Sequence, residues 1–465
     1  MIKKYFHQNW IFECPDAVMT SSILKCKDES YLIFGGHDKT LYLMDKDLTM
    51  LDDVSFDGWA RCCYPIDLDG DGCEEILVGT GDGRLIALKF DEKKKKLFGI
   101  MNYKSFGMIN CCAAGNLYQD ENIELVFGGE EKTLKIFKNV SATEPVLTFY
   151  YDSWVTACAL GYLKLSQFKD VIYCLVIGTK KGQLQVIHFK EGKPEILWQK
   201  QIYAQINDIK IGDVTNEGYN QIIVASDDSY VKIYDSEGKR ISFIKIEEVE
   251  TNKKSKDRKK LNRAKSLLID DIDGDNANEI VVGSADGILR VYQNKSLNSK
   301  SFELKWRTSQ SSGSIRGICT YLDEIKENKI KNIIFGGYGR TLRNVFDFEY
   351  GKKPVLKIPV RFKASKPPAK KVPKKAEKKE EIKVVPTSLR GFIKELINVH
   401  GFYLTLDLLI NELMLKGYDR KEIEDELEFL KSQGAMIYDK IDVNVWSLVS
   451  EEIDELIEKN TKKAK

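Results

Sequence analysis

The sequence predicts a mainly β protein, a seven-bladed β-propeller followed by a small α+β domain. Three observations lead to this prediction. A self-similar unit recurs along residues 1–362, each copy contains stretches that suit four short strands, and a helical pattern replaces the repeat after residue 387. Four strands per repeat, at a period of about 40 to 50 residues, are typical of propeller blades.

The clearest copy of the unit runs from Asp67 to Leu88 and contains an acidic loop, an apolar strand, a tight turn and an alternating strand. A second copy runs from Asp271 to Tyr292, and a looser one begins at Asp213. A small residue ends the apolar strand of every unit. These residues, 44 to 58 positions apart, mark seven units: Gly35, Gly79, Gly128, Gly178, Ala225, Gly283 and Gly336.

The turn that follows is best defined at Asp82-Gly83 and Asp286-Gly287. Such pairs predict two-residue hairpin turns in which both central residues have positive φ. The predicted blade therefore has a tight turn between its second and third strands.

A ring of blades must close, because an open outer edge leaves backbone groups unpaired. The segment Lys4–Phe12 matches the fourth strand of the other units. We expect it to complete the blade that begins near Ile315, and Val355–Phe362 can add to the same blade.

Beyond the ring the composition changes abruptly. Residues 363–387 hold nine Lys, three Glu and four Pro, a net charge of +6, and predict an extended, flexible linker. In residues 388–465, Ser388, Thr405 and Asp419 suit helix caps, and residues 435–448 suit a two-stranded wing. Within the ring, residues 252–260 form a basic insertion that we expect at the surface.

The 465-residue chain, with 43% hydrophobic and 31% charged residues, has the composition of an ordinary soluble protein. No apolar run approaches the roughly 18 residues of a membrane span, and the first ten residues lack the apolar core of a signal peptide. We therefore expect a cytoplasmic protein. The ten cysteines form no Cys-x-x-Cys pair, and buried reduced thiols are the favoured interpretation. Several fall on predicted inner strands: Cys62, Cys63, Cys111, Cys112, Cys158 and Cys319.

Two loops carry acid at relative positions 1, 3, 5 and 9 and predict a cation site. These residues are Asp67, Asp69, Asp71 and Glu75 in one loop, and Asp271, Asp273, Asp275 and Glu279 in the other. Four carboxylates drawn toward one point repel one another unless a hard cation lies among them, and Ca²⁺ accepts roughly six to eight oxygen ligands with loose geometry. We expect structural Ca²⁺ in both loops, since neither offers a paired nucleophile and base.

A purely structural interpretation stays open, in which Asp and Gly only form the turn. Two weaker loops lack several of the acids, and we expect hydrogen bonds alone to hold them. They contain Asp213, Thr215, Glu217 and Gln221, and Asn116, Asp120 and Glu124. An EF-hand is disfavoured, because that motif needs flanking helices and a Glu at the twelfth loop position.

The loop Asp-x-Asp-Gly-Asp-Gly before Ile-Leu-Val-Gly, together with Phe34-Gly-Gly, Phe127-Gly-Gly and Phe335-Gly-Gly, resembles the FG-GAP repeats of integrin-alpha-like propellers. The resemblance covers residues 1 to 362, and two of the seven units carry the full loop. It implies a seven-bladed propeller with cations on one face and partner binding chiefly on the opposite face. The chain is more similar to cytoplasmic members of the group, which serve as scaffold subunits, than to integrins.

The C-terminal region resembles winged helix-turn-helix domains of replication proteins, which suggests DNA binding. Residues 388–449, however, hold seven Lys or Arg against eleven Asp or Glu, a net charge of −4. Because phosphate neutralisation supplies most non-specific affinity, a protein-docking role is favoured. Nucleic-acid binding through the basic linker is the alternative.

No nucleotide-binding loop, nucleophile elbow or metalloprotease motif occurs, and the four His are scattered. A quinone-cofactor propeller enzyme would need a regular Trp in each blade, which is missing. Trp59 and Trp154 begin inner strands and can lie near a rim with His37, Tyr338 and Arg340, although core packing is favoured for both Trp. The sequence thus predicts a non-enzymatic, cytoplasmic scaffold that binds one or more proteins.

Overall fold

The structure is a computed structural model of the full chain. It describes residues 6–246, 262–296, 299–311, 313–325, 328–348 and 350–352, and residues 413–414, 418–421, 423, 425, 427, 436–438 and 446–448. The chain divides into two compact units, Met1–Lys371 and Val372–Lys465. The boundary between them falls within the stretch predicted to be a linker.

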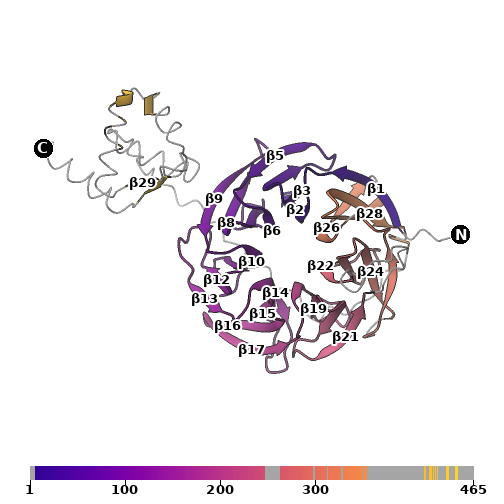
Figure 1. The fold of residues 1–465 in the computed structure, drawn as a ribbon. Coiled ribbons are helices and arrows are strands. Elements are labelled where there is room, and N and C mark those ends of the chain that lie inside the picture. Colours follow the sequence, from indigo (N-terminus) through magenta and orange to yellow (C-terminus); the bar gives the residue numbers. More distant parts are fainter. Residues whose placement is uncertain are drawn as a thin grey trace, which may run out of the picture. The chain divides into compact units, whose positions relative to one another are not determined.

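The first unit is a seven-bladed β-propeller, as the repeats predict. The described residues of this unit form seven four-stranded antiparallel sheets around a central channel (Figure 1). The first strands of neighbouring blades contact one another all the way round, including β2 with β26. The ring is therefore closed, and the repeat spacing corresponds to one blade per unit.

In each blade the strands follow one another from the channel outward. Blade 1 has β2 (Val18–Cys26), β3 (Glu29–Gly36), β4 (Thr40–Met44) and β5 (Met50–Ser55). Blade 2 has β6 (Ala60–Ile66), β7 (Glu75–Thr80), β8 (Arg84–Asp91) and β9 (Lys96–Lys104). Blade 3 has β10 (Ile109–Gly115), β11 (Glu124–Gly129), β12 (Thr133–Phe137) and β13 (Leu147–Tyr150). Blade 4 has β14 (Val155–Leu163), β15 (Ile172–Thr179), β16 (Gln183–Lys190) and β17 (Lys193–Gln201).

Blade 5 has β18 (Ile206–Gly212), β19 (Gln221–Ser226), β20 (Tyr230–Tyr234) and β21 (Arg240–Lys245). Blade 6 has β22 (Ala264–Asp270), β23 (Glu279–Ser284), β24 (Leu289–Asn294) and β25 (Phe302–Arg307). Blade 7 has β26 (Ile315–Ile325), β27 (Asn328–Gly337), β28 (Thr341–Asp347) and, from the other end of the unit, β1 (Phe6–Glu13).

The N-terminal strand closes the ring, as the sequence predicts. β1 pairs antiparallel with β28, from Phe6 opposite Asp347 to Glu13 opposite Thr341. Blade 7 is thus built from both ends of the repeat region, with its first three strands from the C-terminal end and its fourth strand from the N-terminal end. The segment expected to add to this blade, residues 355–362, lies outside the described residues.

The small residue at the end of each second strand makes room for the next blade. A Cβ atom at Gly128 would lie 2.4 Å from Cγ1 of Val155, the first residue of β14. In blade 5, Ala225 takes this place, and the following inner strand begins with Ala264, as β6 begins with Ala60, where the other inner strands begin with Ile or Val; Ala225 and Ala264 belong to one buried cluster. The substitution is tolerated because the neighbouring side chain is smaller.

The hairpin turns differ from the prediction in one respect. Gly83 and Gly287 have φ of 91° and 77°, but Asp82 and Asp286 are not among the residues with positive φ. A turn with both central residues in the left-handed region was therefore the wrong prediction. A single left-handed residue after a type I turn produces the same tight connection.

Only a few residues of the second unit are described. β29 (Met436–Tyr438) pairs antiparallel with β30 (Trp446–Leu448), inside the segment predicted as a wing. Asp419 accepts a hydrogen bond from the Lys421 backbone N–H at 3.1 Å, as a helix cap does. The winged helix-turn-helix prediction otherwise falls outside the described residues and stays a prediction, as do the predictions for residues 252–260 and 363–387. No helix in the described part of the chain is long and apolar enough to cross a membrane.

Candidate functional site

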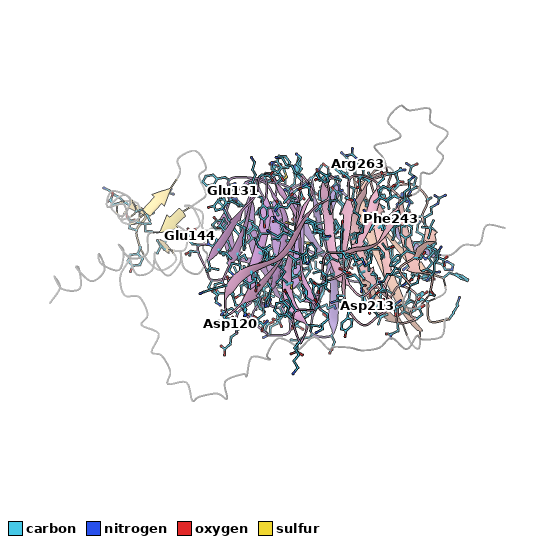
Figure 2. All side chains as sticks on the ribbon, turned by 90° about the horizontal axis from the view of Figure 1, so that it is seen from below. Asp120, Glu131, Glu144, Asp213, Phe243 and Arg263 are labelled. Atoms are coloured by element: carbon cyan, nitrogen blue, oxygen red, sulfur yellow. A yellow bond between two sulfur atoms is a disulfide. The ribbon has the colours of Figure 1, made fainter. Side chains whose placement is uncertain are left out.

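The predicted acidic loops lie together on one face of the ring. Each connects the first and second strands of its blade, and Figure 2 places Asp120 and Asp213, from two such loops, on one side. Glu131 and Arg263, from connections at the other end of the strands, lie on the opposite side (Figure 2). We call the first side the acidic-loop face and the other, which carries the turns between second and third strands, the hairpin face.

Part of each acidic loop serves the turn itself. In the first loop, Asp67 accepts hydrogen bonds from the backbone N–H groups of Gly70 and Gly72, at 2.6 and 3.1 Å. Glu75 accepts one from the Leu68 N–H at 2.8 Å. Positions 1 and 9 of the loop thus satisfy backbone donors that the turn leaves without partners.

The equivalent loop of blade 5 separates the role of the turn from the role of charge. Gln221 stands at position 9 there and accepts a hydrogen bond from the Val214 N–H at 2.8 Å, as Glu75 does from Leu68. A neutral amide oxygen is therefore sufficient for this bond. The negative charge of Glu75 and of Glu279 is not required by the turn, which leaves it available for a cation.

The first loop gathers three of its four predicted ligands. Oxygens of Asp67, Asp69 and Asp71 lie within 4.8 Å of one another and form a cluster that could hold a metal ion. The fourth, Glu75, is joined to the group through Lys89 of β8, whose Nζ lies 2.9 Å from Asp71 and 3.0 Å from Glu75 and also contacts Asp69. Burial by itself would lower the pKa of Lys89, but these carboxylates outweigh it and raise that pKa.

The loop of blade 6 is more deeply buried and gathers a different triad. Oxygens of Asp271, Asp273 and Glu279 lie within 4.8 Å of one another, whereas the predicted ligand Asp275 is not part of this group. Lys305 of β25 pairs with Asp273. Burial, and then the charge of Asp273, raise the pKa of Glu279 to about 9, and Lys305 partly opposes that rise.

The donor sets of both loops suit a hard divalent cation, since carboxylate oxygens are the ligands that Ca²⁺ prefers. The lysines supply positive charge at the same oxygens. A divalent ion would therefore compete with an ammonium group that belongs to the fold, which the sequence prediction did not include.

The weaker loops were expected to rely on hydrogen bonds alone. In blade 5, Asp213 accepts a bond from the Gly218 N–H at 2.7 Å, in agreement with that expectation. In blade 3, Asn116 accepts one from the Asp120 N–H at 3.0 Å. There Lys138 also pairs with Asp120, so the expectation is wrong for this loop: an ion pair contributes as well.

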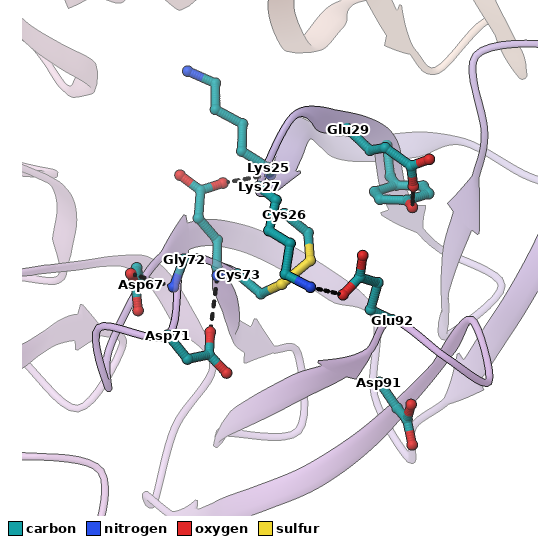
Figure 3. Close-up of a disulfide and its surroundings, with 12 residues drawn as sticks. Lys25, Cys26, Lys27, Glu29, Asp67, Asp71, Gly72, Cys73, Asp91 and Glu92 are labelled. Carbon is teal, nitrogen blue, oxygen red and sulfur yellow. Dashed lines mark hydrogen bonds and ion pairs between the residues drawn. A yellow bond between two sulfur atoms is a disulfide. The ribbon is translucent and has the colours of Figure 1, made fainter. Parts of the chain in front are cut away.

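A disulfide bond lies beside the first acidic loop (Figure 3). Cys26, at the end of β2, is bonded to Cys73, which follows Asp71 in the loop, and their Cα atoms are 3.8 Å apart. The bond links blade 1 to blade 2. The interpretation of all ten cysteines as reduced thiols is thus wrong for this pair, because ring packing brings together two residues 47 positions apart.

The other eight cysteines are free thiols, and five of them are buried. Several face the channel, a cavity of about 690 Å³ whose lining includes Cys62, Cys111 and Cys319. Burial raises the pKa of Cys319 to about 12, so this thiol stays protonated at neutral pH. These residues agree with the prediction of unreactive thiols on inner strands.

The hairpin face carries exposed aromatic residues. Phe106 and Tyr203 are 98% and 87% exposed, and Trp59 and Tyr338 also face solvent. We call these four residues the aromatic rim. The His37 ring stacks on Trp59, with centroids 4.2 Å apart, and meets Tyr338 edge-on.

Core packing was the favoured role for Trp59 and Trp154, and the structure places neither in the core. Trp59 is 38% exposed at the rim. Trp154 lines the channel and lies under the Lys180 ammonium, 3.4 Å from its ring centroid. Both residues come just before the start of an inner strand, where the chain passes over the hairpin face. Arg340 pairs with Asp16 at 3.2 Å on the same face.

Sequence reasoning missed two groups of residues. Phe106 and Tyr203 stand three positions before an inner strand, at the place of Asp57 and Asp152 in other blades, so an alignment of the repeats could have identified them. The lysines at the acidic loops come from strands that follow each loop or from the outermost strand, and no local pattern points to them.

Comparisons with known proteins agree with the fold. Residues 175–315 match the model of the family described as integrin-alpha FG-GAP repeat-containing protein 2, Itfg2. The crystal structure of Saccharomyces cerevisiae Sqt1 superimposes with a TM-score of 0.52 at 12% identity, over 72% of this chain and 97% of that chain. At this identity the likeness to Sqt1 concerns the fold alone. The chain is therefore a seven-bladed β-propeller whose blades 4 to 6 resemble the Itfg2 family of FG-GAP repeat proteins.

Proposed function

We propose that the protein is a non-enzymatic, cytoplasmic scaffold that binds a protein partner on the hairpin face of its propeller. The C-terminal unit, as a winged helix on a flexible linker, engages a second protein. Two binding modules on one chain raise the effective concentration of their partners for each other, which suits the assembly of a complex.

One observation carries the proposal. Phe106 and Tyr203 are almost fully exposed at the tips of loops that connect neighbouring blades. Large aromatic side chains lose hydrophobic stabilisation when they face water, and they are enriched among residues that dominate protein interfaces. Their position on a closed, rigid ring gives a partner a surface that needs little ordering on binding.

The acidic loops have a supporting role in this proposal. Ca²⁺ held by the clusters around Asp69 and Asp273 stabilises blades 2 and 6 from the face opposite the partner. The ion contributes to the stability of the ring and takes no part in recognition.

The proposal is tested with a double variant of the aromatic rim, Phe106→Ala/Tyr203→Ala. Partners captured by the wild-type chain from cytoplasmic extract are identified, purified, and measured for affinity against each variant. We expect the affinity of the double variant for the partner to fall at least about tenfold, since each interface aromatic contributes about 1 to 2 kcal/mol or more to the free energy of binding.

The matched control is Phe98→Ala/Ile196→Ala, which removes exposed apolar side chains from the outer strands β9 and β17. Equal loss in the control and the rim variant would contradict a specific role for the hairpin face. Deletion of residues 388–465 in the same assay separates partners of the C-terminal unit from partners of the ring.

The alternative function is that of a nucleic-acid-associated factor. Its support is the net charge of +6 in residues 363–387, which can hold an anionic polymer without sequence preference. A salt-sensitive shift of DNA or RNA by the full chain, lost when residues 363–387 are replaced by a neutral linker of equal length, favours this function. An absence of any shift at low salt removes it.

A further inference from the structure

The mouth of the channel on the hairpin face has an arc of positive charge. The second residue of each inner strand faces the channel there: Met19, Arg61, Asn110, Thr156, Asn207, Lys265 and Arg316. The three cations stand on blades 6, 7 and 2, with only Met19 of blade 1 interrupting the arc. Blades 3, 4 and 5 contribute neutral side chains.

The neutral half of this ring has a structural role. Asn110, Thr156 and Asn207 each donate a hydrogen bond to the carbonyl of the first inner-strand residue in the next blade, at 3.2, 2.6 and 2.7 Å. These bonds tie adjacent blades together at the mouth. The cationic residues do not take part in this carbonyl pattern: Arg61 donates to the side chain of Asn110 in the next blade, and Lys265 pairs with Asp227 of the preceding blade.

The positive charge is only partly neutralised. Asp227 pairs with both Lys265 and Arg263, and one carboxylate therefore serves two cations. Arg61 and Arg316 make no ion pair within the described part of the chain, and the Nε atom of each is buried without a hydrogen-bond partner there. Arg61 donates to the Asn110 side-chain oxygen at 3.0 Å.

The surroundings of the two arginines reinforce this imbalance. Burial and the nearby Arg61 lower the pKa of Arg316, and Tyr338 and Asp227 partly oppose that shift, although a guanidinium stays charged at any pH at which the protein is folded. Burial lowers the pKa of His37, and the charges of Arg61 and Arg316 act in the same direction while that of Asp16 opposes them. The Arg316 guanidinium also lies 5.6 Å from the centroid of the Tyr338 ring, a member of the aromatic rim.

We propose that the channel mouth binds a carboxylate side chain of an acidic peptide segment in the protein partner, with Arg61 and Arg316 as the recognising groups. Guanidinium groups bind carboxylates through two parallel hydrogen bonds, which would satisfy the buried donors. The channel volume of about 690 Å³ admits side chains, and Trp59 and Tyr338 beside it supply apolar contacts for the rest of the segment.

A nucleic acid fits this surface less well. Its phosphates need an extended basic track, whereas here the cations lie inside the mouth and exposed acids surround it. Asp57 and Asp152, on the same face, have side chains that are 78% and 68% exposed. These acids repel any anion along the face, and a nucleic acid, with a phosphate at every nucleotide, meets more of them than a short glutamate peptide does.

The test uses the full chain and a fluorescent hexaglutamate peptide, with hexaglutamine as the uncharged probe. In the variant Arg61→Gln/Arg316→Gln we expect at least about a tenfold weaker affinity for hexaglutamate, the factor that corresponds to loss of about 1.4 kcal/mol. Arg61→Lys/Arg316→Lys keeps the charge but loses the fork, and we expect it to restore part of the affinity. Lys93→Ala, on the acidic-loop face, is the control and leaves binding unchanged.

The basic linker also attracts glutamate, so a photo-crosslinking benzophenone on the peptide is used to identify which part of the chain the peptide contacts. Crosslinks to the hairpin-face loops in wild type, lost in the Gln variant at an unchanged melting temperature, support the proposal. Equal affinity of wild type and a folded Gln variant overturns it. So does a result in which the Gln substitutions weaken binding of a twelve-residue oligothymidine, or of inorganic phosphate, but not of hexaglutamate.

The inference rests on the proposed function but fails separately from it. If hexaglutamate does not bind while partner capture still depends on Phe106 and Tyr203, the scaffold remains and only the acidic chemistry of the partner is wrong. If the peptide binds but the rim variant retains every partner at full affinity, the aromatic rim is the wrong docking surface.

Discussion

Lys89→Met removes the ammonium group that contacts three carboxylates of the first acidic loop. In wild type this group lies 2.9 Å from Asp71 and 3.0 Å from Glu75, and Glu75 is only 1% exposed. Without it, four acids face one another with no cation. The thioether has a similar length and keeps the apolar part of the side chain packed.

The magnitude follows from the burial of the two partners. Breaking a fully buried pair costs about 3 to 5 kcal/mol, and an exposed pair contributes about 0 to 1 kcal/mol. Lys89 is 23% exposed and Glu75 is buried, so we expect a loss of about 2 kcal/mol in EDTA. For a domain of about 350 residues, with an unfolding entropy of about 2.1 cal/mol/K per residue, the melting temperature falls by about 3 °C.

Calcium should stabilise the variant more than it stabilises wild type, and so reverse the loss that the substitution causes. In wild type the ion must displace Lys89, and in the variant it finds the carboxylates free of that competitor. At about 100 times the dissociation constant, ligand binding adds about 2.7 kcal/mol to the free energy of unfolding. Thermal unfolding in EDTA and in Ca²⁺, followed by circular dichroism, measures both effects.

The matched control is Lys27→Met. Lys27 pairs with Glu92 near the same loop, but its side chain is 60% exposed, and we expect the variant to melt at the temperature of wild type. The reasoning is refuted if Lys89→Met melts like wild type in EDTA, or if Ca²⁺ stabilises wild type and the variant equally.

Three further predictions concern the same face and the ring. Glu279→Gln should keep the hydrogen bond from the Ile272 N–H, as Gln221 accepts the equivalent bond from the Val214 N–H. The variant should no longer bind Ca²⁺ in blade 6. A calorimetric Ca²⁺ titration that still finds a site in this blade would contradict the prediction. Gly36→Ala should destabilise the ring by about 3 kcal/mol, because its Cβ would lie 1.8 Å from the Ala17 carbonyl oxygen. Urea unfolding measures this change in the free energy of unfolding. The control Gly72→Ala has open space around its Cβ and shows the effect of a positive φ without a steric clash. Thiol titration of the denatured chain should find eight free thiols before reduction and ten after it, and Cys26→Ser should cost up to about 4 kcal/mol by the chain-entropy estimate for a 47-residue separation. Ten thiols without reduction would show that the bond between blades 1 and 2 does not form.

The fold could be predicted because its signals are local and repeated. The alternation of side chains, the small residue after each second strand and the turn chemistry are each read within a few residues, and seven copies reinforce one another. Closure by the N-terminal strand was also predictable, since β1 has the pattern of a fourth strand and one blade lacked it. The acid positions of the loops were visible for the same reason, and Asn276, which stands in blade 6 where the first loop has Gly72, has a left-handed φ of 72°.

The residues that complete the sites were not predictable in this way. Lys305 reaches Asp273 from 32 positions away, and Arg61 and Arg316 come near each other only because the last blade meets the first. The secondary-structure propensity and periodicity of the sequence do not report such contacts, because the contacts depend on how seven sheets pack around one axis. By itself the sequence determined the repeat, the closed ring and the acid-rich loops, because backbone geometry is set by neighbouring residues. Only the tertiary structure decided which charges those loops and the channel mouth contain, because electrostatic partners are selected by distance in space.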